Sequence, residues 1–435
     1  MLYRKSFRFL ITSVALLLLT GYTLSGSTAA PATVPLSLGP VVVISEEASA
    51  QYEPAIAYNS KHNEYLVVWE NSWANGYHDV YAARVSADGR LLSTFVVSSN
   101  PDYKKINPSV AYDPDHDRYL VVFAYDVFGN GSDWDIYGRF IPWNGPDAYE
   151  LDRVICSWTT NQMHPVVAFG RAAGDHGEFM VAWVNAPSGQ PNYISARRVF
   201  ADGSGFPPGD GFTVSSGSEH RDFPDVAYNL HRNEYLVIYD VEKNANNLDI
   251  YGIRLRDDGV PLTGGNPNVT GEFPIAGWPD YEEMPAVAAC YQADQYLVAW
   301  QSDIGTSKTN FALYAFYLNG DAIPGNIYEI SHATLPKLNV DVACDFGGNG
   351  YLLAWQDKYV GGEYGIWARQ ASASGSLGPE FEVYGPRAAA DREHPAVAGG
   401  YSNFMTAWEH DRDNGNIDIR GRLLGYYVFL PLAKK

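Results

Sequence analysis

Polar and charged side chains recur in this sequence at two positions of a repeated pattern. The first position directly follows an apolar run that ends in an aromatic residue. It is occupied in turn by Glu70, Ala124, Val184, Asp240, Gln301, Gln356 and Glu409. The second lies just before a Pro-x-Val-Ala phrase or its variant, and the residues there are Glu53, Asn107, His164, Asp222, Glu283, Asn339, Glu393 and His394. If the fold brings carboxylates at these positions together, they can shift one another's pKa and act as acid and base.

These two positions allow either binding or catalysis. If the protein is an enzyme of the glycoside hydrolase or polysaccharide lyase class, the candidate acids are Glu283, Asp222 and Glu393. If it only binds a ligand, the candidate acceptors are Glu70, Asp240, Gln301, Gln356 and Glu409. The alternative for each residue is that it satisfies the backbone of its own loop. Glycoside hydrolysis requires two carboxylates at a defined separation, and the sequence does not give the distance between two side chains.

Aromatic residues in the loops are candidate ligand contacts, because rigid rings offer contact area at low entropic cost. The residues concerned are Trp73, Trp134, Trp278 and Tyr359. The alternative is that each ring packs beneath its own loop.

One acidic loop has oxygen spacing suited to calcium. Asp411, Asp413 and Asp418 surround a glycine turn, and Ca²⁺ takes six to eight oxygen ligands. A second run, from Asp113 to Asp117, alternates carboxylates. The alternative for both is a solvated polar turn. No cofactor is required by any motif, since metalloprotease, nucleophile-elbow and phosphate-loop patterns are absent from the sequence.

The repeat that carries these positions occurs seven times. Its opening phrases begin at Pro54, Pro108, Pro165, Pro224, Pro285, Val340 and Pro395, which are 54 to 61 residues apart. In the second repeat, strands are expected at 108–112, 119–123, 135–140 and 152–157, with a tight Asn-Gly turn between the last two. Four antiparallel strands repeated seven times predict an all-β, seven-bladed β-propeller over residues 38–424. A β-solenoid is the alternative, but its coils are usually much shorter.

The two ends of the array predict how the ring closes. The last repeat lacks a fourth strand, whereas Val41–Ser45 resembles the fourth strands at 95–98 and 212–215. We therefore expect the N-terminal strand to complete the last blade. Closure removes exposed strand edges, which would otherwise promote aggregation.

Arginines recur in the third strand, at Arg84, Arg139, Arg197, Arg254, Arg369 and Arg422. We expect them to play a structural role, paired either with the acidic residues that open that strand or with a neighbouring blade.

Residues 1–30 have the features of a secretory signal peptide: a basic start, an apolar run and a small-residue cleavage site. The net charge is −20, and it becomes −23 without this segment, which contains three basic residues and no acidic one. Such an acidic surface disfavours nucleic acid and anionic lipid as partners. The tail at 425–435 is too short to span a membrane as a helix. We expect a secreted or cell-surface monomer without a transmembrane segment in its mature form.

Three cysteines, Cys156, Cys290 and Cys344, are too few for a disulfide framework. Cys290 and Cys344 follow the opening phrase in neighbouring repeats, so a bridge between them is one option. Three buried, inert thiols are the favoured interpretation.

The motifs at Tyr235–Tyr239 and Asp249–Arg254 resemble those of a broad group of secreted bacterial β-propeller repeat proteins. The resemblance covers most of the chain and implies the fold rather than an activity. The uniform repeats favour a binding module for carbohydrate or extracellular protein. A glycoside hydrolase or polysaccharide lyase, with its site at the central face, is the alternative.

Overall fold

A computed structural model of the chain describes residues 36–425, except 148–149, 172–176, 208–210, 263–270, 291–292, 304–309, 322–323, 333, 349, 386–389 and 413–415. The expected signal peptide and all of the C-terminal tail after residue 425 therefore lie outside the described residues. Within them the chain forms only strands and turns, and no helix there could span a membrane.

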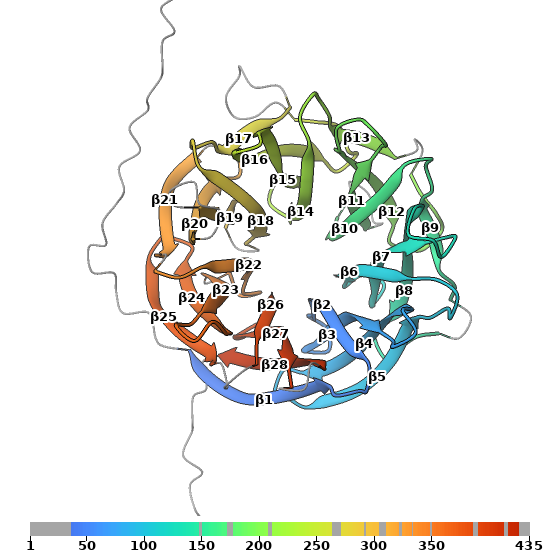
Figure 1. The fold of residues 1–435 in the computed structure, drawn as a ribbon, viewed down its shortest axis with the longest axis horizontal. Coiled ribbons are helices and arrows are strands. Elements are labelled where there is room, and N and C mark those ends of the chain that lie inside the picture. The colour runs from blue at the N-terminus through green and yellow to red at the C-terminus, as the bar shows by residue number, and fades with distance from the viewer. Residues whose placement is uncertain are drawn as a thin grey trace, which may run out of the picture.

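The strands form seven four-stranded antiparallel sheets arranged around one axis, which confirms the predicted β-propeller (Figure 1). Blades 1 to 3 comprise β2 (Ala50–Asn59), β3 (Glu64–Ser72), β4 (His78–Ser86), β5 (Leu91–Ser98); β6 (Lys105–Asp113), β7 (Arg118–Asp126), β8 (Trp134–Pro142), β9 (Arg153–Cys156); and β10 (Asn161–Gly170), β11 (Glu178–Ala186), β12 (Tyr193–Phe200), β13 (Phe212–Ser215). Blades 4 and 5 comprise β14 (Arg221–Asn229), β15 (Glu234–Asn244), β16 (Asn247–Arg256), β17 (Phe273–Ala276); and β18 (Tyr281–Ala289), β19 (Gln295–Asp303), β20 (Phe311–Asn319), β21 (Pro324–Ser331). Blades 6 and 7 comprise β22 (Lys337–Cys344), β23 (Gly350–Lys358), β24 (Tyr364–Ser372), β25 (Leu377–Tyr384); and β26 (Arg392–Gly399), β27 (Asn403–Asp411), β28 (Ile417–Gly425), β1 (Ser37–Ser45).

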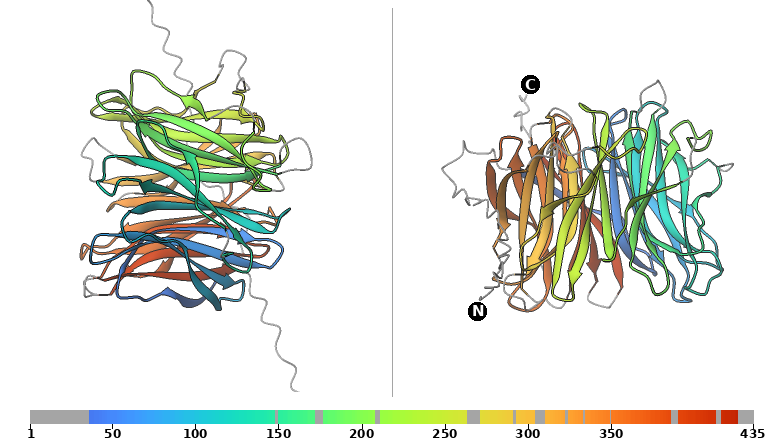
Figure 2. Two further views of the ribbon diagram at one scale, coloured as in Figure 1. Left: turned by 90° about the vertical axis from the view of Figure 1, so that its right-hand side faces the viewer. Right: turned by 90° about the horizontal axis from the view of Figure 1, so that it is seen from above.

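The first strand of each blade lies at the axis and the fourth lies at the rim (Figure 1). Seen from the side, the blades stand next to one another and their strands run across the thickness of the disc (Figure 2). The loops between second and third strands and the links between blades therefore share one face, and the remaining loops share the other.

Ring closure occurs as the sequence predicts. The N-terminal strand β1 pairs antiparallel with β28, with Val42 opposite Gly421 and Ser37 opposite Gly425. The strand begins at Ser37, four residues before the predicted segment Val41–Ser45. The first and last strands of the propeller thus share one sheet, and no blade is left with three strands.

The hydrophobic core lies between the blades. Among the described residues, buried apolar side chains fall into seven clusters, and each cluster joins two neighbouring blades. Trp69 of β3, for example, packs with Met405 and Ala407 of blade 7. The tryptophans that end the second strands are fully buried at Trp69, Trp183, Trp300, Trp355 and Trp408. The aromatic run of the repeat therefore packs each blade against the one before it.

The recurrent arginines occupy two different positions, although the sequence pattern suggests one. Arg139, Arg197, Arg369 and Arg422 each donate to an outer-strand carbonyl of the preceding blade, over 2.6–2.7 Å. Arg84 and Arg254 instead pair within their own blades, with Glu64 and Glu234 at the start of the second strand. Both sets are structural, and the first set connects blades.

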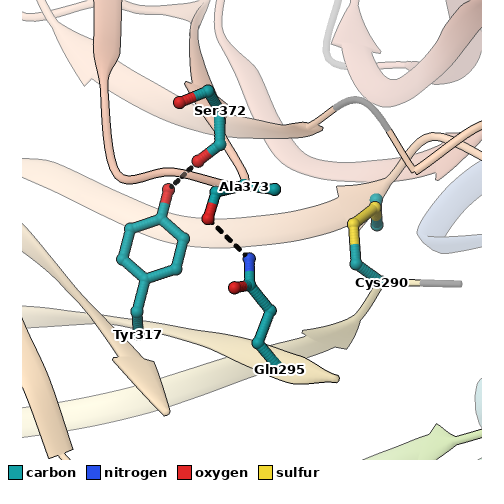
Figure 3. Close-up of a disulfide and its surroundings, with 6 residues drawn as sticks. Cys290, Gln295, Tyr317, Ser372 and Ala373 are labelled. Atoms are coloured by element: carbon teal, nitrogen blue, oxygen red, sulfur yellow. Dashed lines mark hydrogen bonds between the residues drawn. A yellow bond between two sulfur atoms is a disulfide. The ribbon is translucent and has the colours of Figure 1, made fainter. Parts of the chain in front are cut away.

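Blades 5 and 6 are joined by a disulfide between Cys290 and Cys344, whose Cα atoms lie 5.2 Å apart (Figure 3). The expectation of three inert thiols is therefore wrong for these two residues, and only Cys156 is a buried free thiol. Two further contacts cross the same seam. Gln295 Nε2 donates to the Ala373 carbonyl over 3.0 Å, and the Tyr317 hydroxyl donates to the Ser372 carbonyl over 2.8 Å.

The closing strand offers a direct test of how much closure stabilises the ring. Ile44 is 2% exposed and packs into the cluster between blades 7 and 1, whereas its neighbour Val43 is 41% exposed. We expect Ile44→Ala to lower the free energy of unfolding by about 2–4 kcal/mol, because it leaves a cavity in that core. Val43→Ala should change it by less than about 0.5 kcal/mol. Denaturant unfolding of both variants measures this, and equal stabilities would contradict a stabilising role for β1.

Candidate ligand-binding site

A ring of seven unusual backbone positions surrounds the propeller axis. In every blade the residue before the Pro-x-Val-Ala phrase, or its variant at Val340, has a positive φ between 44° and 52°. These residues are Glu53, Asn107, His164, Phe223, Met284, Asn339 and His394. Non-glycine residues rarely adopt this left-handed conformation, so its repetition in each blade marks a built feature of the inner strand.

A β-bulge produces the left-handed residue. In β2, Tyr52 is opposite Glu70, but the next paired residue, Ala55, is opposite Val68. The inner strand therefore contains one residue more than its partner, and the same shift recurs in all seven blades. Bulges re-aim side chains, and here they bring the left-handed residues to the axis.

The left-handed residues surround a cavity of about 360 Å³ on the axis. Its lining comes from the inner strands of all seven blades: Glu53, Pro54, Ala55, Asn107, Pro108, Ser109, His164, Pro165, Val166, Phe223, Pro224, Asp225, Met284, Pro285, Ala286, Asn339, Val340, Asp341, His394 and Pro395. Ligand pockets typically measure about 300–1,000 Å³, so the cavity is large enough for a small polar molecule.

The three catalytic candidates of the sequence do not belong to this lining. Asp222, Glu283 and Glu393 lie one residue earlier and pair with Asp240, Gln301 and Glu409 across the first two strands. The cavity positions in blades 4 and 5 instead belong to Phe223 and Met284, which sequence reasoning missed. Counting back one residue from each proline would have identified both.

Each catalytic candidate has protein partners close by. Asp222 accepts hydrogen bonds from Asn192 Nδ2 at 2.9 and 3.2 Å, and Glu283 accepts one from Gln301 Nε2 at 2.7 Å. Burial raises the pKa of Asp222 and of Glu393. Whether any of the three takes part in catalysis stays a prediction.

Four of the five predicted ligand acceptors connect neighbouring blades. Glu409 Oε1 accepts the Glu53 N–H at 2.9 Å, from the next blade. Gln301 and Gln356 accept the corresponding N–H groups of Asn339 and His394 at 2.9 and 3.0 Å. Of the other two acceptors, Asp240 lies near the backbone N–H of Met284 in the next blade, and Glu70 contacts the His78 ring. Their role toward a ligand stays a prediction, but each already has a structural partner.

Two half-buried carboxyl groups connect the inner strands of neighbouring blades. Asp225 accepts the N–H groups of Val226 and, in the next blade, Val287, at 2.8 and 2.7 Å. Asp341 makes the same pair of contacts with Val342 and Val397, at 2.8 and 2.6 Å. Burial raises the pKa of Asp225 to about 7 and that of Asp341 to about 6. Both line the cavity, so Asp225 is a further acid–base candidate that the sequence did not reveal.

The cavity is chemically asymmetric, and its two histidines show this. His394 lies 3.0 Å from Glu409 Oε1, and Glu53 and Glu393 are close to it. Burial opposes its charge, but the ion pair with Glu409 and the surrounding carboxylates raise the pKa of His394 to about 9. At the equivalent position in blade 3, His164 packs against Phe223 with ring centroids 5.2 Å apart. Burial lowers the pKa of His164.

The three tryptophans predicted as ligand contacts each bind or pack against other parts of the protein. Trp73 and Trp134 donate their ring N–H groups to Asp79 at 2.9 Å and to the Gly131 carbonyl at 3.2 Å. Trp134 is also buried in the core between blades 2 and 3. Trp278 packs edge-on against Tyr314, with centroids 4.8 Å apart. None of the three lines the central cavity.

The predicted calcium loop is only partly described, because Asp413 lies outside the described residues. Asp418 is fully buried and pairs with Arg412 and, at 3.0 Å, with Arg420. In the second acidic loop, Asp113 accepts the N–H groups of Asp115 and His116 at 2.8 and 3.2 Å. That loop has the contacts of a hydrogen-bonded turn, while calcium binding at Asp411–Asp418 stays a prediction.

Comparison with known proteins supports the fold. No protein-family model matches the chain, and no curated protein matches it. Among solved structures, the polysaccharide lyase Uly1 matches with a TM-score of 0.51 at 9% identity, over 90% of this chain and 99% of that one. An α-L-arabinanase of Penicillium chrysogenum, complexed with arabinobiose, has a TM-score of 0.49 at 14% identity, over 89% and 98%. A protein of unknown function from Dyadobacter fermentans has a TM-score of 0.48 at 12% identity, over 90% and 99%.

The two histidines should respond to pH in opposite ways. The folded pKa of His394, about 9, lies above its ordinary value of 6.5, so its contribution to stability is present below pH 6.5 and is lost as the pH rises through 9. The pKa of His164 is lowered, so its contribution is present above pH 6.5 and declines as the pH falls. His394→Asn should flatten the alkaline limb of the stability curve, and His164→Asn should flatten the acidic limb. Denaturant unfolding from pH 5 to 9.5 tests this, and identical profiles would contradict it.

Proposed function

We propose that the protein binds a carbohydrate in the central cavity. The observation that carries the proposal is the division of the lining. Glu53, Asn107, Asn339 and His394 present hydrogen-bonding groups from blades 1, 2, 6 and 7, and Phe223 presents an exposed ring from blade 4. Blade 4 (β14–β17) lies across the axis from blades 7 and 1 (Figure 1). Sugars combine hydroxyl groups with an apolar C–H face, so a lining of this kind suits them.

Phe223 is the aromatic residue best placed for this role. It is 37% exposed, lines the cavity and is braced by the His164 ring. The loop tryptophans hydrogen-bond or pack against neighbouring loop and strand residues, so their removal would disturb folding as well as binding. One of the structures with a similar fold is named as a polysaccharide lyase, which supports a carbohydrate as the ligand class. At 9% identity the similarity is one of fold.

The carbohydrate proposal predicts a result for a screen of glycans and polysaccharides against the purified protein. We expect Phe223→Ala to weaken binding to any glycan found by at least about tenfold, equivalent to about 1.4 kcal/mol, because it removes a stacking surface. Phe128→Ala is the control, since Phe128 is 69% exposed and does not line the cavity. Equal affinities of the two variants in calorimetry would contradict the proposed location. The absence of glycan binding by the wild type would contradict the ligand class.

A second function, glycoside hydrolysis or lysis, is favoured by one observation. The cavity contains a carboxyl group, Asp225, with a pKa of about 7, where a group can both donate and accept protons near neutral pH. Product analysis in the same screen distinguishes the two functions. Shortened or unsaturated products that disappear with Asp225→Asn or Glu283→Gln would establish catalysis. Binding without products supports a recognition module.

We also propose that the protein acts outside the cytoplasm. The signal-peptide pattern of residues 1–30 supports this, and so does the Cys290–Cys344 disulfide, because such bridges persist in oxidising compartments. We expect the exported protein to lack residues 1–30 and to contain one disulfide. Cell fractionation with mass spectrometry of the intact protein measures both, and a cytoplasmic protein with three free thiols would contradict this proposal.

A further inference from the structure

The seam between blades 7 and 1 brings together one imidazole and two carboxylates. Glu53 comes from β2, His394 from β26 and Glu409 from β27. Their candidate ligand atoms all lie within 4.8 Å of one another, and His394 Nδ1 is 3.0 Å from Glu409 Oε1. Within the part of the chain that the structure describes, no other group of three or more His, Cys, Asp or Glu side chains meets this spacing.

We propose that Glu53, His394 and Glu409 bind a divalent cation of the Zn²⁺ or Mn²⁺ type, at the edge of the central cavity. One nitrogen and two carboxylate donors suit these ions, whereas Ca²⁺ prefers oxygen donors alone. Two donors that each lie about 2.0 Å from one tetrahedral ion are about 3.3 Å apart, close to the separation of the His394 and Glu409 atoms. The Glu53 donor completes the set, since its candidate ligand oxygen lies within 4.8 Å of the other two donor atoms.

The charge around the three residues favours a cation. Glu70 and Glu393 lie near the two carboxylates of the site, and no lysine or arginine among the described residues lines the cavity. A bound divalent ion would neutralise this excess of negative charge, and solvent could complete its coordination from the cavity.

The backbone holds the donors in place. The Glu53 N–H is bonded to Glu409, and the His394 N–H is bonded to Gln356 of the preceding blade. Both residues also have the left-handed conformation of the bulge. A site held by rigid strands loses little conformational entropy on binding, which favours affinity.

The repeat itself supplies conservative variants. Glutamine occupies the Glu409 position in blades 5 and 6, where Gln301 and Gln356 accept the same interblade hydrogen bond. Asparagine occupies the His394 position in blades 2 and 6 with the same positive φ. Glu409→Gln and His394→Asn therefore replace strong donors for Zn²⁺ or Mn²⁺ with weak amide oxygens, while keeping side chains that the fold already accepts. His164→Asn is the matched control, because it makes the same change at the equivalent position beside Phe223.

Calorimetric titration of the chelator-treated protein with Zn²⁺, and separately with Mn²⁺ and Ca²⁺, tests the site without any glycan. We expect one Zn²⁺ or Mn²⁺ per chain, and affinity at least tenfold lower in Glu409→Gln and in His394→Asn. His164→Asn should bind as the wild type does. Because the metal alone is the probe, this inference stands or fails independently of the carbohydrate proposal.

Three outcomes would overturn the site: no transition-metal binding by the wild type, unchanged affinity in His394→Asn, or an equal loss in His164→Asn. Thermal unfolding of each variant without metal verifies that the ring is intact. If Glu409→Gln unfolds, His394→Asn still decides the question, because its side chain accepts no interblade hydrogen bond in the wild type.

Discussion

The structure depends on contact between neighbouring blades. Each blade is a twisted sheet whose apolar side chains are buried only when the next blade covers them, and the seven core clusters all lie at such seams. A sheet that relies on both neighbours cannot be stable at the end of an open array, so the ring has to close. The pairing of β1 with β28 meets this requirement with a strand contributed by the other end of the chain.

The seams differ in how they are held, although the blades share one pattern. The arginines of four blades donate to an outer strand of the blade before them, near the rim. Near the axis, acceptors such as Gln356 and Asp225 bind N–H groups of the blade that follows. Blades 5 and 6 alone are also joined by a disulfide within the described residues. Hydrogen bonds to buried partners contribute about 0.5–1.5 kcal/mol each, so apolar contact dominates and the polar contacts set the alignment.

Much of the fold could be predicted from the sequence, because the repeat recurs with its own turns and apolar runs. The site was harder to predict, and Asp222 and Glu283 show why. Side chains alternate along a strand, so a single extra residue in a bulge changes which of two neighbours reaches the axis. The bulge leaves no distinctive residue type in the sequence, since Glu53, Phe223 and His394 all occupy it. The disulfide was missed for a related reason: spacing of the cysteines places them in adjacent repeats but does not give their separation.

The ring of left-handed residues separates the shape of the cavity from its chemistry. The backbone of these residues is set by the bulge and by hydrogen bonds to the preceding blade. Their side chains nevertheless include carboxyl, amide, imidazole, phenyl and thioether groups. None of the seven is β-branched, as expected where φ is positive. Seven points on the wall can thus be exchanged one at a time without rebuilding a strand. Different combinations of side chains at these seven positions could therefore bind different ligands on the same backbone.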